Sequence, residues 1–135
     1  MTKLIAFDMD GTLTESKTDI DAEMVDLLTK LQKIKKVAVI GGASFKQFQK
    51  QFLRYLTYHD NLFILPTSGA SFYEYKDNQW SLVYKLSLSE IEKRQILEAF
   101  DQTFKEINYQ PPAVTYGPTI EVRDECEIAF STLGQ

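Results

Sequence analysis

Residues 4–13 read LIAFDMDGTL, an apolar run that ends in two carboxylates and a glycine. Leu4 to Phe7 form the run, whose continuous apolar character is typical of a parallel strand buried on both faces. Asp8 and Asp10 follow it directly, and Gly11 lets the backbone turn sharply after them. Because open parallel α/β sheets bind ligands beyond the carboxyl ends of their strands, this position favours a functional site.

Two carboxylates at this spacing can meet one phosphoryl group and one Mg²⁺ ion. Asp8 would attack phosphorus and form an aspartyl-phosphate, and Asp10 would protonate the leaving oxygen and later activate water or an incoming hydroxyl. Mg²⁺ prefers oxygen ligands, here Asp8 and Asp10, and would offset the repulsion between carboxylate and phosphate. A polar turn at a strand end is the plainer alternative. A calcium loop is excluded, because its glycine would stand at the sixth position, whereas Gly11 is the fourth residue counted from Asp8.

The first half of the chain alternates between strand and helix patterns. Strands are predicted over 4–7, 37–40 and 62–65, the last of them stopped by Pro66. A helix from about residue 21 and a second helix that starts at Ser44 separate them. The apolar faces of these two helices are predicted to comprise Met24, Leu27, Leu28, Leu31 and Ile34 in the first and Phe45, Phe48, Phe52 and Leu56 in the second. This alternation predicts an α/β fold with a parallel sheet.

The pattern changes after Gly69. Residues 71–75 and 79–86 are predicted to form a hairpin, and a capping box over Ser87-Leu88-Ser89-Glu90 opens a helix that runs to about residue 108. Residues 119–123 and 128–131 then form a second predicted hairpin. Hairpins with one helix are typical of an α+β module. The sequence therefore predicts two domains, residues 1–68 and residues 69–135.

The composition narrows the functional classes. A net charge of −4 gives no electrostatic reason to expect a nucleic acid or an anionic membrane as partner. Cys126 and His59 are the single cysteine and the single histidine, which excludes an internal disulfide and a metal site built from these residue types. The apolar run at residues 4–7 is too short for a signal peptide or a membrane span. We therefore expect a cytoplasmic protein.

Residues 7–14, FDMDGTLT, resemble the first motif of the haloacid dehalogenase (HAD) superfamily. That family's catalytic pair maps onto Asp8 and Asp10, and Thr12 matches the residue that follows the family's glycine. The resemblance implies a partial Rossmann-like core, an α+β cap, and Mg²⁺-dependent transfer of a phosphoryl group. Gly11 and Thr12 would contact that group.

The likeness extends to the eukaryotic-type phosphomannomutases. It is carried by residues 39–42, 66–77, 120–123 and 128–134. By this resemblance Gly41 and Gly42 lie in the phosphate-binding loop. Ala43 stands where the family has a hydroxyl, and Ser44 follows one residue later, either as a phosphate ligand or as the cap of its helix.

Two further positions concern the cap. Arg123 matches a cap arginine that binds the phosphate distal to the reacting centre, although a strand arginine paired with Glu121 or Asp124 is the alternative. Gln135 stands where the family has a second arginine, and glutamine brings no charge. A mutase must hold a bisphosphorylated intermediate in two orientations, whereas a phosphatase holds its substrate in one. The replacement of the second arginine by Gln135 therefore favours a phosphatase.

The sequence thus predicts a HAD-type phosphatase that acts on a sugar phosphate or a similar small ester with Mg²⁺. A phosphomannomutase is the alternative, and a non-catalytic remnant that serves as a binding module is a second one. The resemblance covers the first half of a longer enzyme, and the family's lysine and acidic magnesium loop follow the cap. We therefore expect near-background activity from this chain alone and an exposed strand edge at residues 4–7. Whether the protein forms a homodimer through the cap stays open.

Overall fold

The computed structural model describes residues 3–134. The chain divides into two compact units, Met1–Leu86 and Ser87–Gln135. Gln135, which the sequence analysis placed at a phosphate-binding position, lies outside the described residues.

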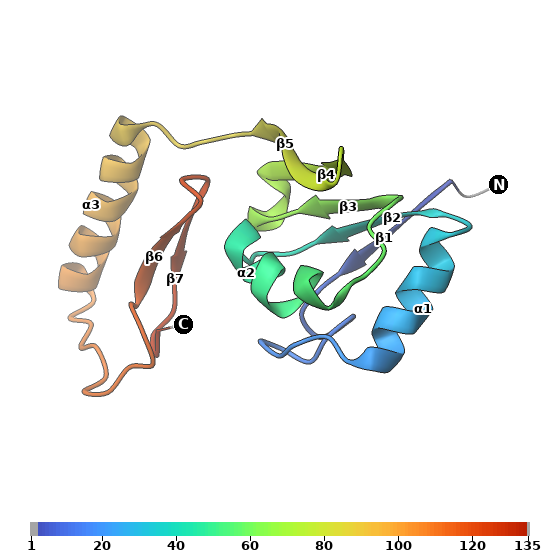
Figure 1. Ribbon diagram of the computed structural model, residues 1–135. Helices are drawn as coiled ribbons and strands as arrows, with labels where there is room; N and C mark the ends of the chain where they lie inside the picture. Colours follow the sequence, from blue (N-terminus) through green and yellow to red (C-terminus); the bar gives the residue numbers. More distant parts are fainter. Residues whose placement is uncertain (1–2, 135) are drawn as a thin grey trace. The chain divides into compact units, whose positions relative to one another are not determined.

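The first unit contains a five-stranded sheet in the order β1-β2-β3-β4-β5 (Figure 1). Strands β1, β2 and β3 run parallel, and β4 and β5 continue the sheet in antiparallel fashion. The bounds of the five strands are Leu4–Asp8, Lys36–Ile40, Leu62–Leu65, Ser71–Lys76 and Gln79–Lys85. The parallel strands alternate with helices, which confirms the predicted α/β class.

The β4–β5 hairpin belongs to this sheet. Phe63 of β3 is the register partner of Glu74 in β4, and the turn of the hairpin is formed by Asp77 and Asn78, both with positive φ. The compact unit therefore extends to Leu86, whereas the sequence placed the change of architecture near residues 67–70. Sequence periodicity cannot distinguish a hairpin that extends a sheet from one that starts another, because the pairing partner is distant along the chain.

Two helices and two 3-10 turns complete the first unit: α1 (Ala22–Gln32), α2 (Phe45–Gln51), η1 (Leu53–Tyr55) and η2 (Thr67–Gly69). The carboxylate of Asp21 caps α1 by accepting from the backbone N–H of Met24. The core joins one face of the sheet to both helices through Val37, Val39, Leu62, Ile64, Leu28, Phe48 and Phe52.

The predicted apolar face of α1 was partly wrong. Leu28 is buried, but Leu27 is 51% exposed, and Ile34 lies beyond the end of the helix and is 73% exposed. Gln32 is buried instead, and its side-chain amide donates to the carbonyls of Tyr58 and Asp60. Gln32 was not part of the predicted face, and its burial goes with bonds to a loop that is distant along the chain.

The expectation that β1 is buried on both faces was also wrong. Strand β1 lies at the edge of the sheet, and Leu4 is 49% exposed. Its residues alternate between exposed and half-buried, because only one face of the strand packs on the core. The exposed strand edge that the sequence predicted is thereby confirmed.

The second unit packs one helix with a two-stranded hairpin. Helix α3 (Glu90–Glu106) precedes β6 (Ile120–Arg123) and β7 (Glu127–Phe130), which pair in the predicted antiparallel sense. Contacts among aromatic rings from the helix, the following loop and the hairpin join these elements: Phe100, Phe104, Tyr109 and Phe130. Among the described residues of both units, no helix is long and apolar enough to cross a membrane.

Candidate functional site

The loop after β1 is anchored by the backbone carbonyl of Met9. This oxygen accepts from the backbone N–H groups of Thr12, Leu13 and Thr14 at 3.3, 3.0 and 3.1 Å. The Thr14 hydroxyl donates to the same oxygen over 3.3 Å. The side chains of Met9 and Leu13 are buried in the core. Because the loop is held from both backbone and side chains, its position relative to the sheet is fixed.

Asp8 and Asp10 flank the buried Met9. Asp8 ends β1 and is exposed, and Asp10 is half-buried. Oδ1 of Asp10 accepts from the backbone N–H of Lys17 at 3.0 Å. Gly11 follows with a φ of +80°, a conformation that costs L-residues energy, and its N–H donates to the carbonyl of Thr14 over 2.7 Å. The glycine thus reverses the chain directly after the carboxylates.

A surface hollow of about 510 Å³ adjoins this loop. Its lining includes Gly11, Thr12, Asp19 and Asp21, whereas Asp8 and Asp10 are not among the residues that line it. The pKa of Asp19 is lowered, chiefly because the hydroxyl of Tyr55 donates to its carboxylate, with a further contribution from Arg54. Asp21 serves as the cap of α1. The hollow places the predicted contacts of Gly11 and Thr12 at the surface, where a small ligand has access to them.

The loop after β2 is supported by the turn after β3. The N–H of Gly41 donates to the carbonyl of Leu65 at 3.3 Å, and its carbonyl accepts from the N–H of Ser68 at 2.9 Å. The carbonyl of Ala43 accepts from the N–H of Thr67 at 3.0 Å. A Cβ on Gly41 would lie 3.4 Å from Cζ of Phe48, which leaves little room for a side chain.

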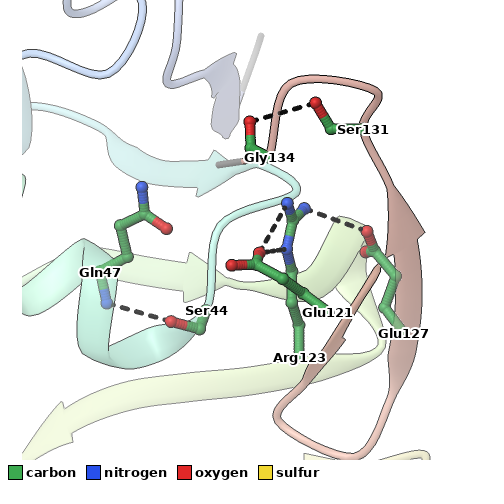
Figure 2. Close-up of polar contacts among 7 residues, drawn as sticks. All are labelled: Ser44, Gln47, Glu121, Arg123, Glu127, Ser131 and Gly134. Atoms are coloured by element: carbon green, nitrogen blue, oxygen red, sulfur yellow. Dashed lines mark hydrogen bonds and ion pairs between the residues drawn. The ribbon is translucent and has the colours of Figure 1, made fainter. Parts of the chain in front are cut away.

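Ser44 acts as the cap of α2. Its Oγ accepts from the backbone N–H of Gln47 at 3.2 Å (Figure 2). This bond is the helix-capping role that was one of the two alternatives for Ser44. Phosphate binding by Ser44, the other alternative, stays a prediction.

The sheet register brings the first two loops together. Asp8 is the register partner of Ile40, and Ile40 is the partner of Leu65. The loops that carry Asp8 and Gly41 therefore start side by side at the carboxyl edge of the parallel strands, where ligands of this architecture bind. Their catalytic and phosphate-binding roles stay predictions.

Arg123 lies in the second unit between two glutamates (Figure 2). Its guanidinium nitrogens are 3.4 Å from Oε2 of Glu121 and 3.3 Å from Oε1 of Glu127. The side chain is only 15% exposed. The ion pair with Glu121 is the alternative to phosphate binding that the sequence analysis named for Arg123. Glu127 belongs to the facing strand β7 and was not expected as a partner. A phosphate that binds Arg123 would meet these two carboxylates as competitors.

The donor set at the end of β1 fits Mg²⁺. Among residues 3–134, no three His, Cys, Asp or Glu side chains are grouped closely enough to hold a metal ion by themselves. Mg²⁺ does not need such a cage, because it usually binds one or two carboxylates together with waters and substrate phosphates. Asp8 and Asp10, with Asp8 exposed to solvent, supply that number of carboxylates.

Two structural features near this edge were not found from the sequence. The N–H of Lys17, whose φ is +59°, holds Asp10 from seven residues away. Thr67 and Ser68 both have positive φ and support the Gly41 loop. Neither feature belongs to a recognisable local motif.

The family model of the haloacid dehalogenase-like hydrolases matches residues 5–130 of this chain. The chain belongs to this family. The family match includes both compact units and confirms the resemblance seen in residues 7–14.

Curated relatives of this family member include phosphomannomutases. A probable phosphomannomutase of Caenorhabditis elegans is 34% identical over 71 residues, which cover 53% of this chain and 26% of the relative. A phosphomannomutase of Schizosaccharomyces pombe is 35% identical over 48 residues, 36% of this chain and 19% of the relative. The matched segments thus span about a quarter or less of the relatives' length.

Solved structures share the fold of this hydrolase-family chain. The IMP-bound IMP-nucleotidase of Plasmodium falciparum, truncated at its N-terminus, has a TM-score of 0.65 at 17% identity, and the match covers 93% of this chain and 39% of that one. A haloacid dehalogenase-like hydrolase from Bacillus subtilis has a TM-score of 0.63 at 22% identity, with 76% and 34% covered. Identities this low support the fold alone.

Proposed function

We propose that this chain carries the nucleophile and the acid/base of a Mg²⁺-dependent phosphoryl-transfer enzyme, a phosphatase of small phosphate esters such as sugar phosphates. The observation that carries the proposal is the pair of carboxylates, Asp8 and Asp10, on an anchored loop at the carboxyl edge of the parallel strands. Membership of a hydrolase family supports the reaction class.

Each residue at this edge has a defined task in the proposed reaction. The carboxylate of Asp8 attacks phosphorus, and the bond from phosphorus to the ester oxygen breaks. Asp10 gives its proton to the departing oxygen and then takes one from the water that hydrolyses the aspartyl-phosphate. The Lys17 N–H orients Asp10 during both transfers. Asp8 and Asp10 would also hold Mg²⁺, which when bound supplies positive charge against the phosphate.

Backbone groups near the two loops are available to hold the phosphoryl group. Gly41 and Gly42 start beside Asp8, and the small size of glycine allows a ligand to approach the main chain closely. Gly11 and Thr12 line a surface hollow beside the first loop. Phosphate oxygens accept well from backbone N–H groups, which is the chemistry these loops offer.

The nucleophile can be tested without relying on turnover. Beryllium fluoride forms a mimic of an aspartyl-phosphate, and we expect ¹⁹F NMR to detect it on the protein only when Mg²⁺ is present. The signal should be lost in Asp8→Asn and kept in Asp26→Asn, which changes an exposed aspartate of α1 paired with Lys30. A signal that survives in Asp8→Asn would contradict the assignment of the nucleophile.

Turnover then separates catalysis from binding alone. In the chain extended through the core elements that the family resemblance places after the cap, aryl and hexose phosphates assayed with Mg²⁺ or with a chelator should release phosphate in a reaction that Asp8→Asn abolishes while circular dichroism stays unchanged. Binding of beryllium fluoride without turnover of any ester would instead favour a non-catalytic binding module.

Phosphomannomutase activity is the second candidate, favoured by the names of the two relatives that are 34% and 35% identical. A mutase would return the phosphoryl group to another hydroxyl of the sugar. With a hexose 1-phosphate as substrate, ³¹P NMR distinguishes the two outcomes, because a mutase yields the 6-phosphate and a phosphatase yields inorganic phosphate.

A further inference from the structure

The turn that follows β3 has an unusual backbone conformation. Thr67, Ser68 and Gly69 have φ values of +49°, +56° and +87°, so three consecutive residues lie in the left-handed region. Glycine adopts this region freely, whereas serine adopts it at a cost and a β-branched threonine is an outlier there. Strained residues of this kind persist only where the surrounding structure holds them, and they cluster at functional sites.

Contacts with three strands hold the turn in this conformation. Thr67 is 1% exposed, and its hydroxyl lies 3.4 Å from that of the equally buried Ser71 in β4. The carbonyl of Gly69 accepts from the hydroxyl of Tyr84 in β5 at 3.0 Å. A Cβ at position 69 would lie 3.3 Å from Cδ1 of Ile40, so the turn also packs closely on the end of β2.

The same turn donates two hydrogen bonds to the loop after β2. The N–H of Ser68 donates to the carbonyl of Gly41 at 2.9 Å, and the N–H of Thr67 donates to the carbonyl of Ala43 at 3.0 Å. Successive N–H groups converge in this way only in a turn, because those of an extended strand point to opposite sides. The left-handed conformation therefore lets two neighbouring residues hold both ends of one loop.

These bonds determine the direction of an N–H group in the loop. The C=O and the N–H of a trans peptide unit point in opposite directions. Because the Gly41 carbonyl points at Ser68, the N–H of Gly42 points away from the turn. Strand β2 lies between β1 and β3 in the sheet (Figure 1), so the side away from this turn is the side of β1, which ends in Asp8.

We propose that Thr67 and Ser68 are positioning residues of the phosphate-binding loop. Their N–H groups hold the carbonyls of Ala43 and Gly41, and this orients the Gly42 N–H to donate to an oxygen of a phosphoryl group at Asp8. A donor that is already oriented stabilises bound phosphate without a rearrangement of the loop. The strain in the turn is the cost of that orientation. The proposal rests on the proposed phosphoryl-transfer function.

The test follows the amide signals of this chain by ¹H–¹⁵N NMR while inorganic phosphate is added in the presence of Mg²⁺. We expect the Gly42 amide signal to shift, and the titration gives the dissociation constant. Ser68→Pro removes the N–H and cannot adopt a positive φ, so it should raise this constant by about tenfold, the equivalent of one hydrogen bond. Ser68→Gly keeps the N–H at the same φ without strain and should reverse the rise.

Asn78→Pro is the matched control. Asn78 has a φ of +60° in the turn between β4 and β5, at the far end of β4 from the turn at Thr67. Proline is incompatible with that φ, so this variant should lower the unfolding temperature and leave the dissociation constant for phosphate unchanged. If Ser68→Pro also lowers only the unfolding temperature, the role of Ser68 is structural and the proposal is overturned.

Two variants of Thr67 examine the turn without proline. Thr67→Val keeps the shape of the buried side chain but removes the hydroxyl that lies beside Ser71, and it should raise the dissociation constant for phosphate. Thr67→Ser keeps the hydroxyl and should reverse most of that rise.

The positioning role and the proposed function fail in different ways. Absence of the beryllium fluoride signal in the wild type would contradict the proposed function and the positioning role together. If that signal is present, a Gly42 amide that does not respond to phosphate would overturn the positioning role alone. An unchanged dissociation constant in both Ser68→Pro and Thr67→Val would do the same.

Discussion

The backbone N–H of Lys17 donates to Oδ1 of Asp10 over 3.0 Å, which ties the carboxylate to a residue seven positions further along the chain. Lys17 reaches this place with a φ of +59°. The contact orients Asp10 while Asp8, at the end of β1, is exposed to solvent. One carboxylate is therefore held in place and the other is accessible, as an acid/base and a nucleophile would need to be.

In the chain extended through the core elements expected after the cap, Asp10→Asn should lower turnover by about 10²–10⁴-fold, the usual range for loss of a general acid or base. Asparagine keeps an oxygen that can accept from the Lys17 N–H, so the unfolding temperature should not change. The loss should be largest for alkyl phosphates, whose leaving oxygen needs a proton, and smaller for nitrophenyl phosphate. Equal losses on both substrates would mean that Asp10 is not the acid.

Ser44→Ala should reduce the free energy of unfolding by about 0.5–2 kcal/mol, because the Gln47 N–H loses its acceptor at the start of α2. Ser44→Asp keeps an acceptor and should retain the stability of the wild type. Urea titrations of both variants measure this difference. If Ser44→Ala instead unfolds like the wild type but weakens the binding of phosphate esters, the serine acts as a ligand.

Arg123→Ala should raise KM for hexose phosphates and leave KM for simple aryl phosphates unchanged. The sequence predicts that Arg123 binds a substrate group distal to the reacting centre, and simple aryl phosphates carry no such group. Glu121 and Glu127 hold the guanidinium in the structure. Glu121→Gln should therefore lower KM for the same sugar substrates by removing a competing carboxylate. An equal rise on both substrate classes in Arg123→Ala would count against a specificity role.

Glu92 should make the stability of the protein depend on pH in the acid range. Its carboxylate accepts from the backbone N–H of Ser89 at 2.7 Å and from the Ser89 hydroxyl at 2.8 Å, and these bonds lower the pKa of Glu92 from its ordinary 4.5. A lowered pKa in the folded state means that this stabilisation is complete above pH 4.5 and is lost as the pH falls through the lowered value.

Glu92→Gln should remove that part of the acid sensitivity, since glutamine does not titrate and still carries an acceptor oxygen. Glu98→Gln on the same helix is the matched control, because Glu98 is exposed and lies 3.9 Å from Arg94. Thermal unfolding followed between pH 3 and pH 6 measures both variants. Parallel pH profiles for Glu92→Gln and the wild type would show that the capping contact does not depend on ionisation.

The sequence by itself determined the features that depend on near neighbours. The run from Leu4 to Phe7 followed by Asp8 indicated a strand that ends in a carboxylate pair. Ser44 was recognised as a candidate helix cap because a cap bonds to a backbone N–H three residues on. The capping box of the later helix was placed at Ser87–Glu90, two residues before the serine that forms it, because Ser89 bonds to Glu92. The hairpin of residues 120–130 was found from its alternation. Signals of this kind lie within one turn of helix or one strand.

Only the tertiary structure decided the features that depend on distant partners. The β4–β5 hairpin belongs to the first sheet because Glu74 pairs with Phe63. Gln32 is buried although it is polar, and its side chain bonds the carbonyls of Tyr58 and Asp60. The edge position of β1 is likewise set by which strands pair, so its exposure departs from what its apolar sequence predicts. Propensity and periodicity describe a segment's own preferences. Strand order, register and burial depend on which other segments it meets.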